Sequence, residues 1–244
     1  MGAALEASGR DIVYSCSWPA YINASESEKP YGEMIMDGCN LWRNWHDIQC
    51  YPPPSGKGAF LQILDYFGDA SSVLAPLAGP GHWHDPDMLI IGNGCISAAE
   101  ERTQMAIWSV LAAPLIMGND PRSIPAPSLS ILTNAFAIAV DQDPLGQMGV
   151  RLETSSASPL QRWVRVLANG DVAVALLNRD GGPSADITLQ FADVSLQSPV
   201  TVFDIWAKRS LGTFESNFTA AAVGLLDTAF LRLTGSGNAV EATH

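Results

Sequence analysis

The sequence contains 244 residues, of which 47% are apolar and 16% are charged, so it can bury a sizeable core and is not disordered as a whole. Its formal net charge of -12 argues against nucleic acid as a partner, because binding a phosphate backbone requires basic patches. The same charge disfavours an anionic membrane surface, and no apolar run reaches the length of a membrane span.

The amino-terminal stretch has no basic leader and no apolar signal segment. Against this stand an even set of four cysteines and two glycosylation sequons, which begin at Asn23 and Asn217. Together they favour an oxidising, secretory-pathway protein with glycans on both asparagines. Secretory-pathway features without a leader indicate a chain that has lost its leader and is the C-terminal piece of a longer protein.

The first expected elements are a strand within residues 10–18, ended by a turn, and a short helix within residues 29–37. A second apolar strand, over residues 41–45, leads to Asp47. In a β/α barrel such strand ends converge on one rim, where catalytic residues lie. Strand alternation could bring Arg43 to this rim, and an arginine beside an aspartate keeps the acid ionised unless an apolar wall or a second carboxylate raises its pKa. The alternative is a buried strand with a salt bridge at its end, which the local residues by themselves favour.

Aromatic and basic side chains surround the end of this second strand. Trp42, Trp45 and His46 suit a pocket that stacks on a sugar ring. A proline run at residues 52–54 then predicts a loop, and apolar spacing predicts a helix over residues 59–68.

Residues 79–93 begin polar and end apolar, which predicts a strand, a turn at residues 85–87 and a buried return. His82 and His84 invite a metal interpretation, but their spacing is not that of a zinc helix and no further histidine lies nearby. We therefore expect no metal here. Two carboxylates placed by a proline turn are better suited to hydrogen-bond substrate or backbone.

A capping box formed by Ser97 and Glu100 predicts the start of a helix that runs to about Leu111. A short apolar strand over residues 114–117 and a helix over residues 128–140 follow. The alternation of strands and helices up to this point predicts an α/β domain, with a parallel sheet.

The pattern changes after Gly149. Alternating apolar residues on both sides of the Asn169-Gly170 turn predict a β-hairpin. We therefore expect two domains, an α/β domain over residues 1–149 and an antiparallel β domain over residues 150–244. Further short strands are predicted over residues 187–191, 200–205 and 229–233.

Six ordered motifs run through the chain: SCSWPAY (15–21), CNLWRNWHD (39–47), AGPGHWHDPDML (78–89), TQMAIWSVLAAPL (103–115), DQDPLG (141–146) and DIWAKRSLG (204–212). Their order and spacing resemble the melibiase-type α-galactosidases and α-N-acetylgalactosaminidases, and are closest to the α-N-acetylgalactosaminidase pattern. The resemblance implies a (β/α)8 barrel followed by an antiparallel β-sandwich domain. A full barrel has eight βα units and this chain shows four, so it looks like the C-terminal half, with strands five to eight.

The resemblance implies a retaining glycoside hydrolase that removes terminal α-linked N-acetylgalactosamine or galactose, using two carboxylates about 5 Å apart. Asp47 matches the general acid/base, and Arg43 would hydrogen-bond sugar hydroxyls. The nucleophile of the family lies on the fourth barrel strand, upstream of Met1, so this chain is expected to lack it. No cofactor is implied. The substrate-binding residues that the resemblance implies are Ser17, Ala20, Tyr21, Arg43, Asp87 and Met88.

Two of these residues bear on which sugar is preferred. The galactosidases of the family tend to carry Glu and Leu at the positions of Ser17 and Ala20, whereas its N-acetylgalactosaminidases carry Ser and Ala. Small residues leave room for an N-acetyl group at C2 of the sugar. The resemblance therefore implies a preference for α-linked N-acetylgalactosamine, with weaker α-galactosidase activity.

The resemblance also implies a disulfide between Cys16 and Cys39, a lysosomal or secreted location, and a homodimer when the enzyme is complete. Whether Cys50 and Cys95 form a second bridge is left open by the sequence. The alternative function is that of a catalytically inactive, truncated sugar-binding or structural remnant. Because a half barrel exposes unpaired strand edges and apolar sheet faces, an incomplete enzyme is favoured over a stable independent lectin.

Overall fold

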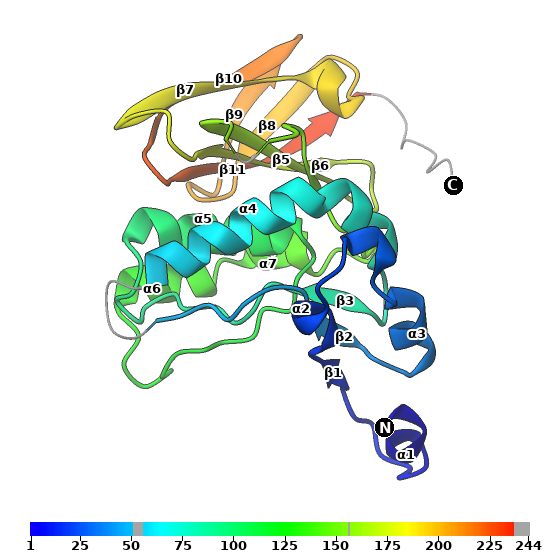
Figure 1. Ribbon diagram of the computed structural model, residues 1–244. Coiled ribbons are helices and arrows are strands. Elements are labelled where there is room, and N and C mark those ends of the chain that lie inside the picture. Colours follow the sequence, from blue (N-terminus) through cyan, green and yellow to red (C-terminus); the bar gives the residue numbers. More distant parts are fainter. Residues whose placement is uncertain (51–55, 156, 237–244) are drawn as a thin grey trace.

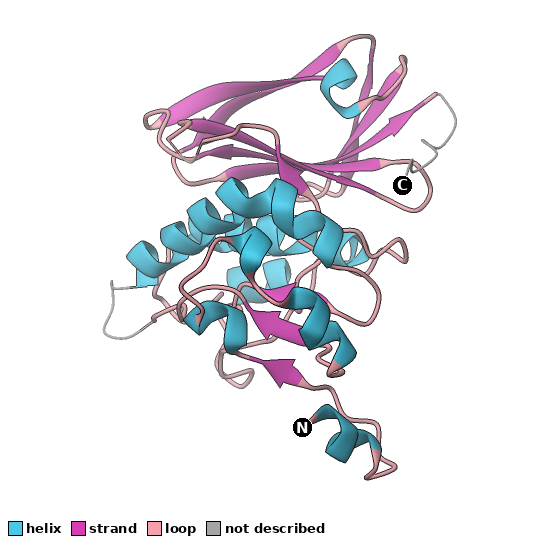
Figure 2. Ribbon diagram, turned by 45° about the vertical axis from the view of Figure 1, so that its right-hand side comes forward, coloured by secondary structure: helices cyan, strands magenta, loops and turns pink. Residues whose placement is uncertain are grey.

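The computed structural model describes residues 1–50, 56–155 and 157–236, and its elements form three layers (Figure 1). A small parallel sheet lies on one side, the helices within residues 56–141 form the middle layer, and antiparallel β sheets cover these helices. Figure 2 shows the same order from a second direction. The loop expected at residues 52–54 and the end of the expected β domain, residues 237–244, lie outside the described residues.

The parallel sheet contains β1 (Ser15–Cys16), β2 (Leu41–Arg43) and β3 (Trp83–Asp85), in that order. The predicted strands within residues 10–18 and 114–117 are shorter than expected, and the second is represented by one parallel bridge, from Leu89 to Met117. Directly before β1, the N–H of Tyr14 donates to the side-chain Oδ1 of Asn40 at 2.8 Å instead of to a strand carbonyl, which ends the regular ladder there.

Helix α5 (Ala98–Val110) begins at the predicted capping box. The backbone N–H of Ser97 donates to Glu100 Oε2 at 2.8 Å, and the N–H of Glu100 donates to Ser97 Oγ at 3.3 Å. The other α-helices in the described part of the chain are α1 (Gly2–Glu6), α2 (Trp18–Tyr21), α3 (Tyr31–Met36), α4 (Gly56–Leu74), α6 (Ala126–Leu132) and α7 (Ala135–Asp141); the 3₁₀ turns are η1 (Glu26–Glu28), η2 (Ala75–Leu77) and η3 (Phe191–Val194).

The helix predicted over residues 128–140 is two helices, α6 and α7. Asn134 separates them because its side chain accepts hydrogen bonds from the N–H groups of Phe136 and Ala137 and so caps α7. Its amide also donates to the carbonyl of Ile205 at 3.0 Å. This long-range contact does not follow from the periodicity of the sequence.

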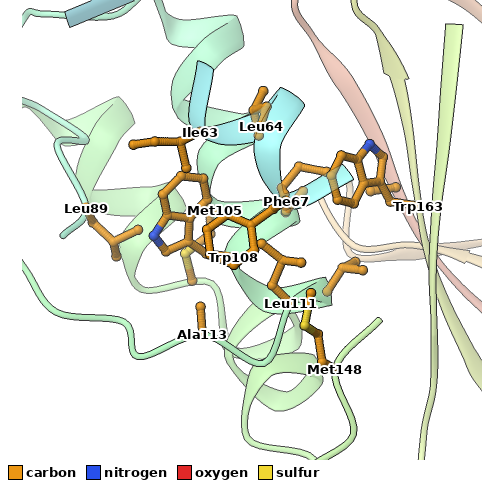
Figure 3. Packing of buried hydrophobic residues seen from close by; sticks show 14 of the residues in the cluster. Ile63, Leu64, Phe67, Leu89, Met105, Trp108, Leu111, Ala113, Met148 and Trp163 are labelled. Atoms are coloured by element: carbon orange, nitrogen blue, oxygen red, sulfur yellow. The ribbon is translucent and has the colours of Figure 1, made fainter. Parts of the chain in front are cut away.

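The largest core lies between α4, α5 and the first β strands of the sandwich (Figure 3). Phe67 of α4, Trp108 of α5 and Trp163 of the β domain are each fully buried. Burial of side chains of this size stabilises a fold by about 1.5–3 kcal/mol each. The two predicted domains therefore share apolar contacts, and the boundary between residues 149 and 150 stays a prediction.

The larger sheet of the sandwich has the strand order β4-β5-β6-β11-β8-β9, and β7 pairs with β10 opposite it. The predicted hairpin is confirmed, with Gly170 in the left-handed conformation that its turn requires. Strands β9 and β10 were not predicted from the sequence. The bounds are β4 (Val150–Arg151), β5 (Leu160–Val166), β6 (Val172–Asn178), β7 (Ser184–Gln190), β8 (Val200–Asp204), β9 (Arg209–Phe214), β10 (Asn217–Gly224) and β11 (Thr228–Gly235).

Strand β6 is buried along its whole length because both of its faces are covered. Ala173 and Ala175 belong to the core that it shares with the helices, whereas Val172 and Val174 belong to the core inside the sandwich. Successive side chains of a strand point to opposite faces, so this alternation assigns one face to each core.

Two disulfides are present, Cys16–Cys39 and Cys50–Cys95. The first is the pairing that the resemblance implies, and the second resolves the alternative left open by the sequence. Within the described ranges, no helix is both long and apolar enough to cross a membrane.

Candidate functional site

Residues that follow β1 and β2 enclose a cavity of about 290 Å³, here called the rim cavity. The parallel pairing of Cys16 with Trp42 places the residues after the two strands next to each other. The structure thereby brings together seven of the residues singled out in the sequence. The rim cavity is lined by Ser17, Ala20, Tyr21, Arg43, Trp45, His46, Asp47 and Gln49.

Asp47 presents an accessible carboxylate to this cavity, because its side chain is 78% exposed. Its Oδ1 accepts a hydrogen bond from Arg43 Nη2 at 3.1 Å. A carboxylate that is open to solvent and held from one side can exchange protons with a ligand, as a general acid or base must.

Arg43 lies between two carboxylates. Its Nη2 is 3.1 Å from Asp47 Oδ1 and 2.8 Å from Asp87 Oδ2, and it also donates to the carbonyl of Trp45 at 3.3 Å. The Arg43 Nε is buried and has no acceptor within hydrogen-bond distance among the described residues. The guanidinium is therefore fixed in place and retains a donor group that is not used.

Asp87 reaches the rim cavity through other residues, since it does not line the cavity itself. Its Oδ2 accepts from the N–H of Ile48 at 2.7 Å, and its backbone carbonyl accepts from Trp108 Nε1 at 2.8 Å. Its φ of 85° lies in the left-handed region, which costs free energy for a residue other than glycine. These bonds hold Asp87 in that conformation and fix the backbone next to Asp47.

Met88 also lies outside the lining of the rim cavity. Its side chain packs so closely on Gly118 that a Cβ added there would lie 2.2 Å from the Met88 sulfur. Its carbonyl accepts from Gln104 Nε2 at 3.2 Å. Contact of Met88 and Asp87 with a substrate therefore stays a prediction.

Asp85 is a further carboxylate near the site, and it is 5% exposed. Burial raises the pKa of its carboxyl group, and this is opposed by a hydrogen bond from the Asp87 N–H and by the charge of Arg43. The Asp85 Oδ1 accepts from the Asp87 N–H at 2.8 Å. Asp85 thus supports the turn that was predicted to place carboxylates for bonding to substrate or backbone.

His84 is buried among protein groups. Its Nε2 donates to the carbonyl of Leu74 at 2.9 Å, and its Nδ1 accepts from Trp42 Nε1 at 2.8 Å and lies 2.8 Å from Asn44 Nδ2. Burial lowers the pKa of His84 to about 4, so the ring is neutral at physiological pH. His84 therefore orients Trp42 behind the site.

One residue of the cavity lining was not singled out in the sequence. Gln49 follows Asp47 by two positions and is exposed. Its position in the same loop was a possible signal, but a single polar residue in a loop is not specific. Trp42, Trp45 and His46 were expected to suit a sugar pocket. Trp45 and His46 lie in the cavity wall, with their ring centres 4.8 Å apart. The expectation is wrong for Trp42, which is fully buried and does not line the cavity.

Two family descriptions match the chain. Residues 1–143 match the Melibiase_2 family, described as Alpha galactosidase A, and residues 157–233 match the family described as Alpha galactosidase C-terminal beta sandwich domain. The chain therefore belongs to the melibiase family, as its motifs indicated.

The chain is similar to particular members of this family. It is 46% identical over 169 residues to Alpha-N-acetylgalactosaminidase of Homo sapiens, covering 69% of this chain and 39% of that protein. It is 48% identical over 179 residues to Alpha-N-acetylgalactosaminidase of Mus musculus, covering 73% of this chain and 41% of that protein. Identity to Alpha-galactosidase A of Homo sapiens is 42% over 185 residues, covering 75% and 41% of the respective chains. The chain spans about two fifths of the length of these curated relatives.

Among solved structures, the chain superposes on alpha-galactosidase I from Mortierella vinacea with a TM-score of 0.82 and 27% identity. The match covers 98% of this chain and 62% of that one. The expected fold class is thereby confirmed as part of a β/α barrel followed by an antiparallel β sandwich.

Proposed function

We propose that this chain supplies the acid/base part of a retaining glycosidase site that removes terminal α-linked N-acetylgalactosamine or galactose from glycoconjugates. The observation that carries this proposal is the rim cavity, in which the exposed Asp47 carboxylate lies beside Arg43, Ser17 and Ala20. Membership of the melibiase family supports it.

In the proposed reaction, Asp47 first gives its proton to the glycosidic oxygen as the bond from that oxygen to the anomeric carbon breaks. A nucleophilic carboxylate then holds the sugar covalently. Asp47 removes a proton from water, whose oxygen displaces that carboxylate from the anomeric carbon. Arg43 would orient the sugar through hydrogen bonds to its hydroxyl groups.

The nucleophile is expected to be a carboxylate on a barrel strand that the sequence does not contain. Asp85 is buried and Asp87 accepts hydrogen bonds from two backbone N–H groups, so neither is free to attack an anomeric carbon. The 244-residue chain assayed by itself is therefore expected to release no product from an aryl α-glycoside.

We further propose a lysosomal or secreted location and a homodimer of the complete enzyme. Two disulfides and two sequons support passage through an oxidising compartment. Size-exclusion chromatography with light scattering would test the dimer, and detection of a mature N-glycan would test the location.

The test of the proposed reaction is Asp47→Asn in a complete barrel that carries this chain. Activity on substrates with poor leaving groups should fall by about 10²–10⁴-fold. The first step, transfer of the sugar to the nucleophile, should slow less for activated aryl glycosides, because a good leaving group departs without a proton. Single-turnover measurements separate the two steps. Equal losses of the glycosylation rate for both substrates would show that Asp47 has a structural role instead.

A further inference from the structure

A second hollow, of about 630 Å³, lies between helix α4 and the segment that leads into η1. We call it the lateral groove. It shares Trp45 with the rim cavity, but its other walls come from different residues. Pockets of about 300–1,000 Å³ suit ligands of the size of one or two sugar rings.

An aromatic pair forms part of the wall of the lateral groove. The rings of Trp45 and Tyr66 stack with their centres 4.5 Å apart and an interplanar angle of 19°. The two rings cover each other's facing sides, and Lys29 Nζ lies over the Tyr66 ring at 5.8 Å from its centre. The C–H face of a pyranose can pack against the parts of Trp45 and Tyr66 that line the groove. Glu26 and Asp65 add carboxylates that can accept hydrogen bonds from hydroxyl groups.

Both sides of the lateral groove are held by interactions made elsewhere. On the η1 side, Glu26 accepts from Lys29 Nζ at 2.6 Å and from the Tyr31 hydroxyl. On the α4 side, Asp65 pairs with Arg179 of the β domain at 3.1 Å. The groove is therefore a fixed feature of the surface.

The sequon at Asn23 adjoins this groove directly. Ala24 and Ser25, the other two residues of the sequon, line the groove, and Asn23 itself is exposed. The N–H of Ala24 donates to the carbonyl of Ile22 at 3.0 Å, which places Asn23 at the centre of a tight turn. A sugar on Asn23 is thus carried by the residue next to the groove wall, whose Cα lies about 3.8 Å from that of Ala24.

We propose that an N-linked glycan on Asn23 folds back into the lateral groove, with its first N-acetylglucosamine rings packed on Trp45 and Tyr66. The attachment joins Asn23 Nδ2 to C1 of the sugar. A lipid-linked diphosphate oligosaccharide supplies the sugar and leaves as the lipid diphosphate, and the amide loses one proton. The proposal rests on the secretory location proposed above and does not depend on hydrolytic activity.

The Ser25 hydroxyl donates to Glu28 Oε2 at 2.6 Å in the folded chain. This bond belongs to the cap of η1, in which the Ser25 N–H also donates to Glu28 Oε2 at 3.2 Å. The sequon is therefore rigid once folded, and the glycan must be attached before this segment folds.

The experiment compares the two sequons of the chain. The 244-residue chain, fused to a cleavable leader, is secreted from a host that makes high-mannose glycans. Endoglycosidase H, which cuts between the first two N-acetylglucosamines, is then applied to the native protein, and glycopeptide mass spectrometry follows cleavage at Asn23 and at Asn217. We expect native cleavage at Asn23 to be about tenfold slower, which corresponds to about 1.4 kcal/mol of protection. After denaturation the two rates should be equal.

A matched pair of variants tests the groove itself. Val73 lines the groove from an exposed position on α4, whereas its neighbour Ser72 is exposed and does not. Val73→Arg should remove the protection of the Asn23 glycan, and Ser72→Arg should keep it. Absence of a glycan at Asn23, equal native rates for the two sequons in the unsubstituted chain, or protection that survives Val73→Arg would each overturn the proposal.

Discussion

Asp87 acts on the candidate site without lining it. One oxygen of its carboxylate binds both Arg43 and the Ile48 N–H, so a single group sets the guanidinium and the backbone beside Asp47. A pattern in the sequence can indicate a carboxylate at a strand end. It cannot indicate that the residue adopts a positive φ and faces the neighbouring loop, because that depends on Trp108, which is 21 positions further on.

At the rim cavity, Ser17 and Ala20 are expected to select the substituent at C2 of the sugar. The double substitution Ser17→Glu and Ala20→Leu in a complete barrel should reverse the preference, so that kcat/KM becomes higher for an α-galactoside than for an α-N-acetylgalactosaminide. The added side chains fill the space of the N-acetyl group, and discrimination by pocket volume amounts to about 1–3 kcal/mol. The measurement compares kcat/KM on two aryl glycosides that differ only in the sugar, α-N-acetylgalactosamine or α-galactose. A double variant that keeps the preference of the parent would show that this loop does not read C2.

Asp141 gives a prediction about pH. Burial raises its pKa to about 7, whereas an aspartate in an unfolded chain titrates near 4. The folded state therefore holds this proton more tightly than the unfolded state. The resulting stability is complete below about pH 4 and is lost as the pH rises to about 7. Asp141→Asn should remove this contribution.

The Tm of Asp141→Asn minus the Tm of the parent should increase from pH 4 to pH 7, because the parent loses stability over this range and the variant does not. Asparagine keeps an oxygen that can accept from Gln142 Nε2, as Asp141 does. Asp180→Asn is the control, because Asp180 is exposed. A Tm difference for Asp141→Asn that does not change over this pH range would contradict the argument.

At the scale of elements, the sequence predicts best those features that depend on contacts between residues close together in the chain. Helix α5 starts as predicted because its capping box joins residues three positions apart. The break between α6 and α7 was missed because Asn134 also binds Ile205, 71 positions away. Strand β9 was missed because its side chains are mostly exposed and show no apolar alternation.

Asn134 therefore has two roles that substitutions can separate. Asn134→Ala should lower the free energy of unfolding by about 1–2 kcal/mol, because it removes the cap of α7 and the donor to Ile205. Asn134→Asp keeps the capping oxygen and removes the donor, so its loss should be smaller. Urea denaturation measures both. A larger loss for Asp than for Ala would show that the cap contributes little.

At the scale of the whole molecule, Arg165 links the two parts of the chain. It lies on β5, is 1% exposed, and donates from Nη1 to the carbonyls of Ser109 at 2.7 Å and Asp141 at 3.2 Å. These carbonyls lie near the C-terminal ends of α5 and α7, where a positive charge is favourable. The sequence showed an arginine in an alternating strand, which ordinarily indicates an exposed side chain.

Arg165→Ala should lower the free energy of unfolding by at least about 2 kcal/mol, because it removes a charged donor from two buried carbonyls and opens a cavity. Arg162→Ala, on the same strand, is the control. Arg162 is partly exposed and pairs with Glu153 and Asp193, so its loss should cost about 0–1 kcal/mol. Differential scanning calorimetry compares the two, and similar losses would show that Arg165 is not a special link.

The pairing of the cysteines also determines what a protease could do to the chain. A cut within residues 17–38 leaves the fragments joined through Cys16–Cys39, and a cut within residues 51–94 leaves them joined through Cys50–Cys95. Residues 40–49 lie between the two bridges and inside neither loop. Between Cys16 and Cys95, a cut in the segment that carries Asp47 would thus separate the chain into two pieces that no disulfide joins. A cut inside either disulfide loop would release separate fragments only after reduction.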